Sequence, residues 1–391
     1  MFSKPISVVM IVTALIGVFL AVLFTEIGQI LNLPSDWFYS IHYIAPTLSV
    51  GLLLITAFVA WRAWRDGYPG KVITIGYVVV MVGSLFVANI FVPEVWLRSQ
   101  QNIATYTSIS DIGDQLNDDD DVFVLEINGD ARAYPRDWLM VPHIAGDEVG
   151  GEETVMTYCA LSNLPQAFSP ALSSGEELNL RVVGQLHNNL TMVDTNTDQL
   201  YQQITGGTPD RDLQLDKFPT QRMTYSAFKV LYPDGKVFVP AKAGPLINLL
   251  DEFTIWAFGK SLTSHYDYDN ESPMFPTLSL EDTRLPSKEP VWGIIVDDDV
   301  VAFTREFFDD KAVYNGEIGG LPVAVAWFEK YQTMGFFSRD VDGAVSEITE
   351  IDAYGNSNAG KLERLPSYPG LFWMIWSHWY PDTGLLGGPT G

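Results

Sequence analysis

Four residues with soft donor atoms follow one another in a β-rich part of the chain: His143, Cys159, His187 and Met192. Neutral imidazole, thiolate and thioether groups suit copper better than calcium or magnesium. If the segments that carry these residues are neighbours in the fold, they predict a copper-type metal site. Copper is therefore one candidate cofactor, and binding would depend on Cys159.

The same stretch also allows nucleophilic catalysis. Cys159 would be the nucleophile and His143 its base, with Asn188 or Asp194 orienting the imidazole. The order His, Cys, Asp is not specific for any enzyme, and an unpaired thiol outside the cell is exposed to oxidation. The sequence therefore leaves open whether the protein is an enzyme.

A third interpretation is non-catalytic, and it is the one that we favour. The protein would bind a small ligand or a partner protein, and a lone Cys and a Met in apolar β-strands would belong to the core. The residues predicted to contact the ligand are His143, Cys159, His187, Asn188 and Asp194.

The composition excludes a role with nucleic acid. The 391 residues include 23 Lys+Arg against 48 Asp+Glu, for a net charge of −25, so no basic face can form for phosphate binding. The chain has 1 Cys and cannot form an internal disulfide. The predicted partners are the lipid bilayer and a membrane or extracytoplasmic protein.

The first hundred residues predict a membrane anchor. Uncharged apolar stretches cover about 6–24, 43–61 and 72–92, each close to the ~20 residues that span a bilayer as a helix. Arg62, Arg65 and Lys71 surround the loop between the second and third stretches, whereas the loop between the first two has no Lys or Arg. The positive-inside rule then predicts a multi-pass protein of the cytoplasmic membrane, with a cytoplasmic N-terminus and an extracytoplasmic C-terminal domain.

The C-terminal part contains two similar segments. Residues 122–169 align without a gap on 291–338, at a constant offset of 169, and Gly150-Gly151 matches Gly319-Gly320. Paired glycines require special backbone angles and rarely align by chance. The fold class predicted is three N-terminal transmembrane α-helices plus a mainly β (α+β) ectodomain built from two internal repeats.

The domain boundaries follow from these patterns. We expect the anchor over 1–100, repeat 1 over 104–240, a connecting segment over 241–289 and a shortened repeat 2 over 290–391. The second copy lacks a counterpart of about 182–207, the region that holds four of the candidates: His187, Asn188, Met192 and Asp194. Any site is therefore predicted in repeat 1. The acidic run Asp118 to Asp121 is interpreted as a solvated linker that leads into the first strand.

Several motifs resemble an uncharacterised family, the domain of unknown function 3179. They occur in the family's order and are found at 127–135 (Ile-Asn-Gly-Asp-Ala-Arg-Ala-Tyr-Pro), 150–151, 157–162, 183–206 and 282–289. The resemblance covers about 118–383 and implies a bacterial or archaeal, often exported protein with no established activity. The family commonly has a Cys-Pro-Leu-Cys-like motif where this chain has Cys159-Ala160-Leu161-Ser162, so the second sulfur is missing.

Overall fold

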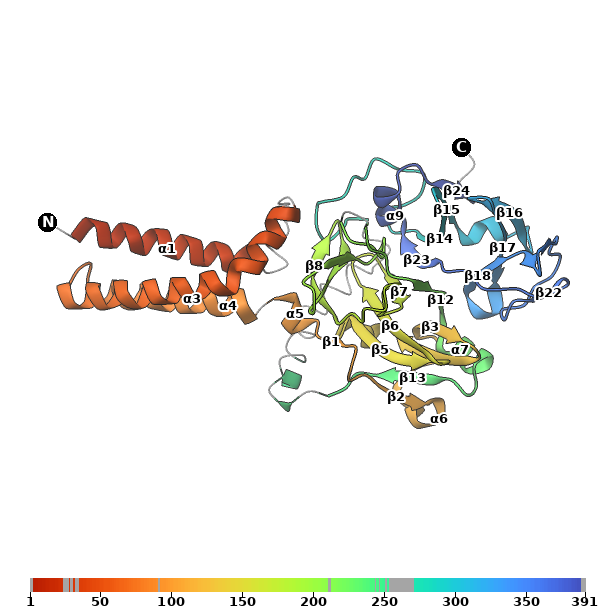
Figure 1. The fold of residues 1–391 in the computed structure, drawn as a ribbon, viewed down its shortest axis with the longest axis horizontal. Helices are drawn as coiled ribbons and strands as arrows, with labels where there is room; N and C mark the ends of the chain where they lie inside the picture. Colours follow the sequence, from red (N-terminus) through yellow and green to blue (C-terminus); the bar gives the residue numbers. More distant parts are fainter. Residues whose placement is uncertain are drawn as a thin grey trace. The chain divides into compact units, whose positions relative to one another are not determined.

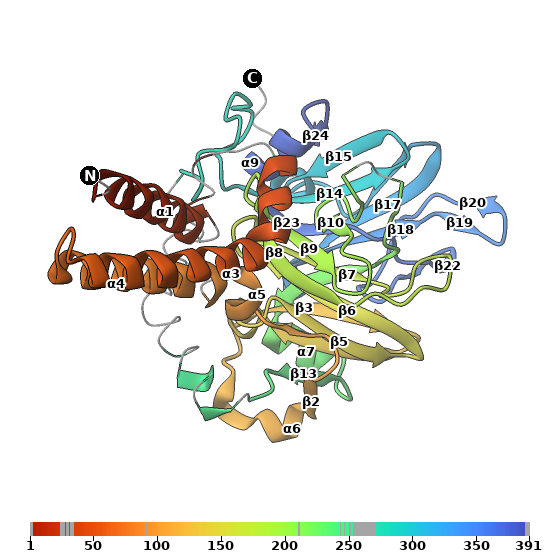
Figure 2. The same ribbon diagram turned by 60° about the vertical axis from the view of Figure 1, so that its left-hand side comes forward.

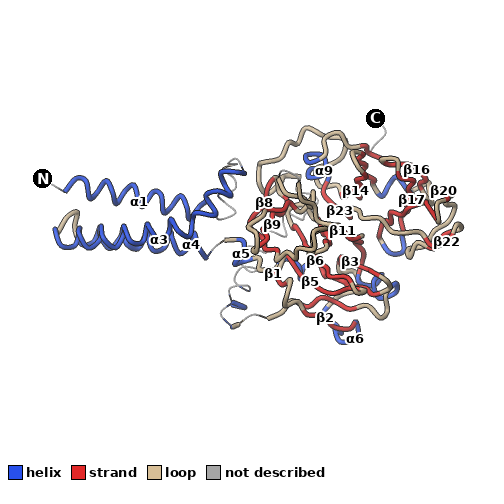
Figure 3. Tube along the Cα trace, viewed as in Figure 1, coloured by secondary structure: helices blue, strands red, loops and turns tan. Residues whose placement is uncertain are grey.

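The computed structural model describes residues 3–23, 28, 31, 35–90, 92–209, 212–242, 244–245, 247–249, 252 and 271–387. The chain divides into two compact units, Met1–Trp96 and Leu97–Gly391. Long helices make up the first unit and strands dominate the second (Figure 3). Part of the predicted connecting segment, 241–289, lies outside the described residues.

The first unit consists of apolar helices. They are α1 (Ser3–Leu23), α3 (Ser35–Asp66), α4 (Lys71–Ile90) and the short α5 (Pro93–Trp96). Three spans, Pro5–Leu23, Tyr43–Asp66 and Lys71–Ile90, are long and apolar enough to cross a membrane. This confirms three apolar helices. α3 extends beyond the predicted 43–61 at both ends, and at its C-terminal end Arg62 and Arg65, which favour helix, continue it.

Polar side chains join the three long helices at their buried faces. The Thr13 hydroxyl on α1 lies 2.8 Å from the Tyr77 hydroxyl on α4, and Asn89 on α4 donates to the Ser49 hydroxyl on α3 at 3.0 Å. Such bonds between helices are a common means of association where both helices are otherwise apolar.

The second unit contains two groups of sheets, which we call the first half and the second half (Figure 1). The strands of the first half are β1 (Ser99–Gln100), β2 (Thr105–Ser108), β3 (Asp121–Ile127), β4 (Asp130–Pro135), β5 (Ile144–Val149), β6 (Glu152–Cys159), β7 (Leu164–Phe168), β8 (Leu180–Leu186), β9 (Asn189–Asp194), β10 (Leu200–Gln202), β11 (Lys217–Phe218), β12 (Thr220–Thr224) and β13 (Lys236–Val239). They form sheets of order β12-β3-β4-β13-β2, β1-β5-β6-β7-β11 and β10-β9-β8.

The second half has fewer strands than the first half. Its strands are β14 (Pro290–Val296), β15 (Asp299–Phe303), β16 (Tyr314–Ile318), β17 (Leu321–Phe328), β18 (Thr333–Ser338), β19 (Asp340–Val341), β20 (Ala344–Val345), β21 (Asn356–Ser357), β22 (Gly360–Lys361), β23 (Tyr368–Phe372) and β24 (Gly384–Leu386). The two main sheets have the orders β23-β14-β15-β24 and β16-β17-β18, and the remaining strands form two short hairpins.

Short helical segments connect these strands. They are α6 (Ile109–Ile112), α7 (Tyr225–Leu231), α9 (Trp373–Trp379) and the 3-10 turns η1 (Gly113–Gln115), η2 (Arg136–Met140), η3 (Arg305–Phe308) and η4 (Glu329–Tyr331). Trp373 and Trp376 are fully buried on one face of α9, as their spacing of three residues favours.

The leading sheets of the two halves share one topology. In each, a hairpin (β3–β4 or β14–β15) is flanked by an antiparallel strand on one side (β12 or β23) and a parallel strand on the other (β13 or β24). Phe123 pairs with Tyr134, and Trp292 pairs with Phe303, each 169 residues further on. In Figure 2, β3 lies in the orange-yellow part of the chain, and β14 and β15 lie in the cyan part.

A glycine corner recurs at the same place in each half. Gly150 and Gly319 have φ of 58° and 56°, and a Cβ on either would overlap the carbonyl oxygen of the preceding hairpin, at Ile127 or Val296. The carboxylate of Asp299 accepts the Gly319 N–H at 2.8 Å, and that of Asp130 accepts the Gly150 N–H at 3.4 Å. No other residue type combines this close approach with a positive φ without strain.

Candidate functional site

Cys159 is the last residue of β6 and is sealed in the core. Its side chain is 2% exposed and packs with Leu190 and Met192 of the β8–β9 hairpin. Its thiol lies 3.8 Å from the carbonyl oxygen of Asn188. Burial raises the pKa of the Cys159 thiol, because a thiolate loses its hydration there. A neutral, enclosed thiol is a poor nucleophile.

His143 lies on the other side of the same sheet. It precedes β5 and accepts a backbone bond from Tyr158, and its ring centroid is 6.3 Å from that of Tyr158. Neighbouring residues of a strand point to opposite faces, so Cys159 faces away from His143. Burial lowers the pKa of His143 to about 4. The structure therefore does not bring the predicted nucleophile and base together.

His187 and Asn188 form the turn between β8 and β9, both with positive φ. The Asn188 side chain donates to the carbonyl oxygen of Phe275 at 2.8 Å and accepts the Phe275 N–H at 3.0 Å. His187 Nδ1 lies 2.8 Å from the carbonyl oxygen of Thr277, and its ring lies 4.6 Å from that of His378. These contacts hold the 275–277 segment against the hairpin.

Asp194 and Met192 also have structural contacts within the first half. Asp194 is fully buried and accepts from the backbone N–H of Asn179 and Thr197, whereas Met192 is a core residue. Across the described parts of the chain, no group of three or more His, Cys, Asp or Glu is placed to hold a metal ion. Ligand binding by the predicted residues stays a prediction, as does the copper site.

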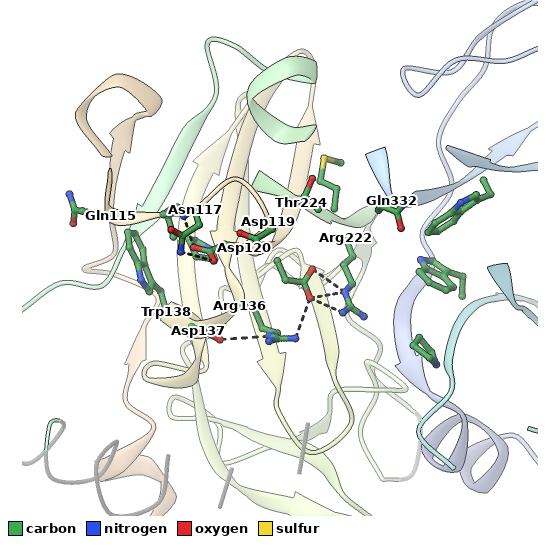
Figure 4. Close-up of a pocket in the computed structure, with 17 residues that line it drawn as sticks. Gln115, Asn117, Asp119, Asp120, Arg136, Asp137, Trp138, Arg222, Thr224 and Gln332 are labelled. Carbon is green, nitrogen blue, oxygen red and sulfur yellow. Dashed lines mark hydrogen bonds and ion pairs between the residues drawn. The ribbon is translucent and has the colours of Figure 1, made fainter. Parts of the chain in front are cut away.

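A cleft of about 630 Å³ lies between the first and second halves (Figure 4). Both halves contribute to its walls, and neither of the predicted histidines nor Cys159 lines it. The lining residues are Gln115, Leu116, Asn117, Asp119, Asp120, Asp121, Pro135, Arg136, Asp137, Trp138, Arg222, Met223, Thr224, Pro290, Trp292, Trp327 and Gln332. We call this the interhalf cleft. Small-molecule sites have volumes of roughly 300–1,000 Å³.

The floor of the interhalf cleft is a set of ion pairs from one sheet. Asp121 opens β3, Arg222 lies in β12 next to it, and Arg136 begins η2 directly after β4. Arg222 Nη2 is 2.7 Å from Asp121 Oδ2, and Arg136 Nη1 is 3.3 Å from the same oxygen. Figure 4 shows both guanidinium groups converging on one carboxylate. Arg222 also donates from Nη1 to the carbonyl oxygen of Gly370 at 3.4 Å, so the three side chains form one fixed ionic group at the floor.

Aromatic side chains form the walls. Trp138 from η2 lies on the side of the first half, while Trp292 from β14 and Trp327 from β17 come from the second. The rings of Trp292 and Trp327 meet edge to face, with centroids 5.2 Å apart. Trp327 donates its indole N–H to Glu329 at 2.7 Å, which fixes the ring in this orientation.

Acidic and amide groups form the rim. The Asp137 side chain is 86% exposed, and Asp119 is exposed as well. Asp120 accepts from the backbone N–H of Asn117 at 2.8 Å, and Gln115 and Gln332 are exposed on the two sides. Asp137 also lies 3.7 Å from Arg136, so the rim and the charged floor are joined by an ion pair (Figure 4).

The ion pairs of the floor exist in one half only. At the offset of 169, Asp121 corresponds to Pro290 and Arg136 to Arg305, which instead pairs with Asp309 and Glu329. Arg222 is the third residue of β12, and the third residue of β23 is Gly370. A Cβ on Gly370 would overlap the guanidinium of Arg222, so this glycine makes room for the floor.

Sequence reasoning missed this cleft. It took Asp121 as part of a solvated linker, although Asp121 is mostly buried, with a side chain 19% exposed, and is paired with two arginines. Arg136 was visible as a residue shared by both aligned segments. That it shares Asp121 with Arg222 could not be inferred, because Arg222 lies 101 residues from Asp121.

The described fold and site define a class of protein: a mainly β domain with a ligand-sized cleft, in a chain with three N-terminal helices apolar enough to span a membrane. The chain belongs to the family described as protein of unknown function (DUF3179), whose sequence model matches residues 100–383. No curated protein and no solved structure was found to match it.

Proposed function

We propose that the protein is a membrane-anchored binding protein that holds a small ligand in the interhalf cleft. The three apolar helices anchor it in the cytoplasmic membrane with the N-terminus inside. The β-rich unit then lies on the extracytoplasmic side. The basic residues Arg62, Arg65 and Lys71, near the loop between α3 and α4, support this orientation.

The two halves of the β-rich unit are, in this proposal, two copies of one ancestral repeat. Their leading sheets share strand order and pairing direction, and their hairpins share residue register at an offset of 169. The glycine corner and the Asp that caps it support the same origin. After duplication, a cleft would form where the two copies are in contact, and the residues on its two walls could then change independently.

The observation that carries the binding function is the arrangement of Arg136, Asp121 and Arg222 at the bottom of a cleft with tryptophan walls. Two guanidinium groups hold one carboxylate, so the charged side chains at the bottom of the cleft are fixed before any ligand binds. A convergent polar floor within aromatic walls is typical of a ligand site.

The test is a thermal-stability titration of the full chain in detergent micelles with maltotriose, citrate, choline and glutamate. A ligand that binds only the folded state stabilises it by about 2.7 kcal/mol at a hundredfold excess over Kd. We expect at least one compound to raise the Tm of the wild type saturably and to lose that effect in Arg222→Gln.

The matched control is Arg181→Gln, an exposed arginine of β8 outside the cleft, which should respond like the wild type. Each variant is compared with its own ligand-free Tm, so a general loss of stability does not count as a loss of binding. No response to any compound, or an equal response in Arg222→Gln, would contradict the proposed function.

A further inference from the structure

The helical unit gathers basic and tryptophan side chains at one end. This is the end where α3 is joined to α4 and where α1 begins (Figure 1). Resting on the proposed membrane anchoring, we propose that this end is a binding site for an anionic phospholipid. Its acyl chains lie in two apolar grooves beside α3, and its headgroup lies against Arg62, Arg65 and Lys71.

The first groove runs between α1 and α3 and has a volume of about 450 Å³. Its lining residues are apolar except for Arg62, which is the last of them along α3. Leu54 and Phe58 lie one turn apart on the same face of α3 and are 69% and 62% exposed. Within a membrane, such a groove is filled by hydrocarbon rather than by water.

The second groove lies between α3 and α4, has a volume of about 320 Å³ and is lined in part by Trp61 and Trp64. Both tryptophans are about half exposed, at 55% and 48%. The guanidinium carbon of Arg65 lies 5.0 Å from the centre of the Trp61 ring, and Lys71 Nζ lies 5.0 Å from that of Trp64. Tryptophan with basic residues is typical of the headgroup level of a bilayer, and these rings hold the cations beside the groove.

The positive charge at this end is only partly neutralised. Between positions 61 and 71, Arg62, Arg65 and Lys71 accompany one acidic residue, Asp66, for a net charge of +2. The two arginines share that carboxylate, with Arg62 Nε 3.1 Å from one oxygen and Arg65 Nε 3.2 Å from the other. The side chains of Arg62 and Arg65 are 37% and 51% exposed, and Lys71 is exposed as well. The surplus charge is therefore accessible to a headgroup.

This charge favours an anionic lipid over two other occupants of the grooves. A zwitterionic lipid has the same phosphate, but it adds an ammonium group that a basic site repels. A second copy of the chain would bring its own surplus of positive charge to a twofold contact. An anionic headgroup instead gains from each Lys or Arg near it, and basic sites between helix ends bind such headgroups.

The experiment is native mass spectrometry of the full chain in detergent micelles, titrated with phosphatidylglycerol or with phosphatidylcholine of the same acyl chains. We expect the first phosphatidylglycerol to bind with a Kd at least about fivefold lower than the first phosphatidylcholine. This is roughly the effect of one Lys or Arg beside an anionic headgroup. Equal Kd values for the two lipids would overturn the anionic class.

Variants of the headgroup site and of the groove should give different results. Arg62→Gln and Lys71→Gln should each weaken phosphatidylglycerol binding about fivefold and leave phosphatidylcholine binding unchanged. Phe58→Ala should weaken both lipids equally, because it removes a wall that the acyl chains of either would contact. Arg181→Gln, exposed on β8, and Phe19→Ala, exposed on α1 outside both grooves, should bind like the wild type.

The outcomes separate this lipid site from the anchoring and from the interhalf cleft. A preference for phosphatidylglycerol that neither Arg62→Gln nor Lys71→Gln reduces would overturn the site at this end. A lipid-free dimer that Phe58→Ala dissociates would overturn the lipid as the occupant of the groove. Either result leaves the cleft ligand standing, because that titration uses water-soluble compounds. Release of the chain from membranes by alkaline carbonate would overturn the anchoring and the lipid site together.

Discussion

Lys217 holds its ammonium group among partners that carry no charge. Its Nζ donates to the carbonyl oxygen of Ile204 at 3.2 Å and to the Tyr368 hydroxyl, and it lies 4.6 Å from the centre of the Tyr368 ring. Burial lowers the pKa of Lys217 from 10.5 to about 7. Carbonyl and phenol oxygens satisfy its donors but compensate only part of the lost hydration.

This lowered pKa predicts a stability that rises with pH above neutrality. Between pH 7 and 8.5 the unfolded chain keeps a proton on Lys217 that the folded chain releases, so the free energy of unfolding increases by up to about 2 kcal/mol across that range. Below pH 7 both states are protonated and this gain is absent. Lys217→Met should flatten the rise, as measured by urea unfolding followed through tryptophan fluorescence.

Lys236→Met is the matched control, because Lys236 is exposed on β13. Its unfolding free energy should follow the wild-type curve with pH. The range ends at pH 8.5 so that tyrosine hydroxyls contribute little. If Lys217→Met and the wild type gave parallel curves, Lys217 would not be the titrating group.

At the scale of elements, the β8–β9 hairpin acts as a clasp on a distant segment. The side-chain amide of Asn188 donates to the carbonyl oxygen of Phe275 and accepts the N–H of Phe275, as a neighbouring strand would. The hairpin falls in the region that has no counterpart in the second half, so this clasp exists once. The turn residues that sequence analysis assigned to a ligand thus bind the protein's own backbone.

Replacing Asn188 should release the clasp without disturbing the turn. Asn188→Gly suits the positive φ of 55° but removes both bonds to Phe275. We expect a loss of about 1–3 kcal/mol, the cost of leaving buried backbone groups unpaired. Amide hydrogen exchange at Phe275 and Thr277 should become faster, more so than in the rest of the β-rich unit.

Asn128→Gly provides the comparison for this prediction. Asn128 also has a positive φ, of 52°, at a hairpin turn, but it contacts Gly150 rather than the 275–277 segment. Both glycines relieve the same backbone strain, so the difference between the two variants isolates the clasp. Equal exchange at Phe275 in both variants would contradict the clasp.

The sequence predicted single helices and hairpins better than the contacts between elements that are far apart in the chain. Hydropathy runs identified the three helices because spanning a bilayer requires a length of apolar chain that little else produces. The β3–β4 hairpin has a similarly local signal, since an Asn-Gly pair such as Asn128-Gly129 is typical of a two-residue hairpin turn. The interhalf cleft has no such local signal. It depends on the pairing of β12 with β3 and on the positions of Trp292 and Trp327, which belong to the second half.

Candidate residues chosen by chemical type failed to converge for the same reason. His143 directly precedes β5 and Cys159 ends the adjacent strand β6, but the alternation of side chains along a strand sends them to opposite faces. Arg136 and Arg222 attracted little attention because an arginine is usually a solvated surface group, and only the fold shows that both share Asp121.

The whole-molecule proposal, an anchor with its binding domain outside the cell, can be tested by cysteine accessibility. In a Cys159→Ser background, Ser173→Cys places a thiol on the exposed surface of the β-rich unit, and Tyr68→Cys places one between α3 and α4. Three crossings with the basic loop inside predict that a membrane-impermeant maleimide labels Ser173→Cys on intact cells and Tyr68→Cys only after permeabilisation. The wild-type chain is the control, because Cys159 is buried and should react only after denaturation. The opposite labelling pattern would place the cleft in the cytoplasm and would contradict the proposed orientation, whereas labelling of both positions on intact cells would contradict the separation of the two sites by a membrane.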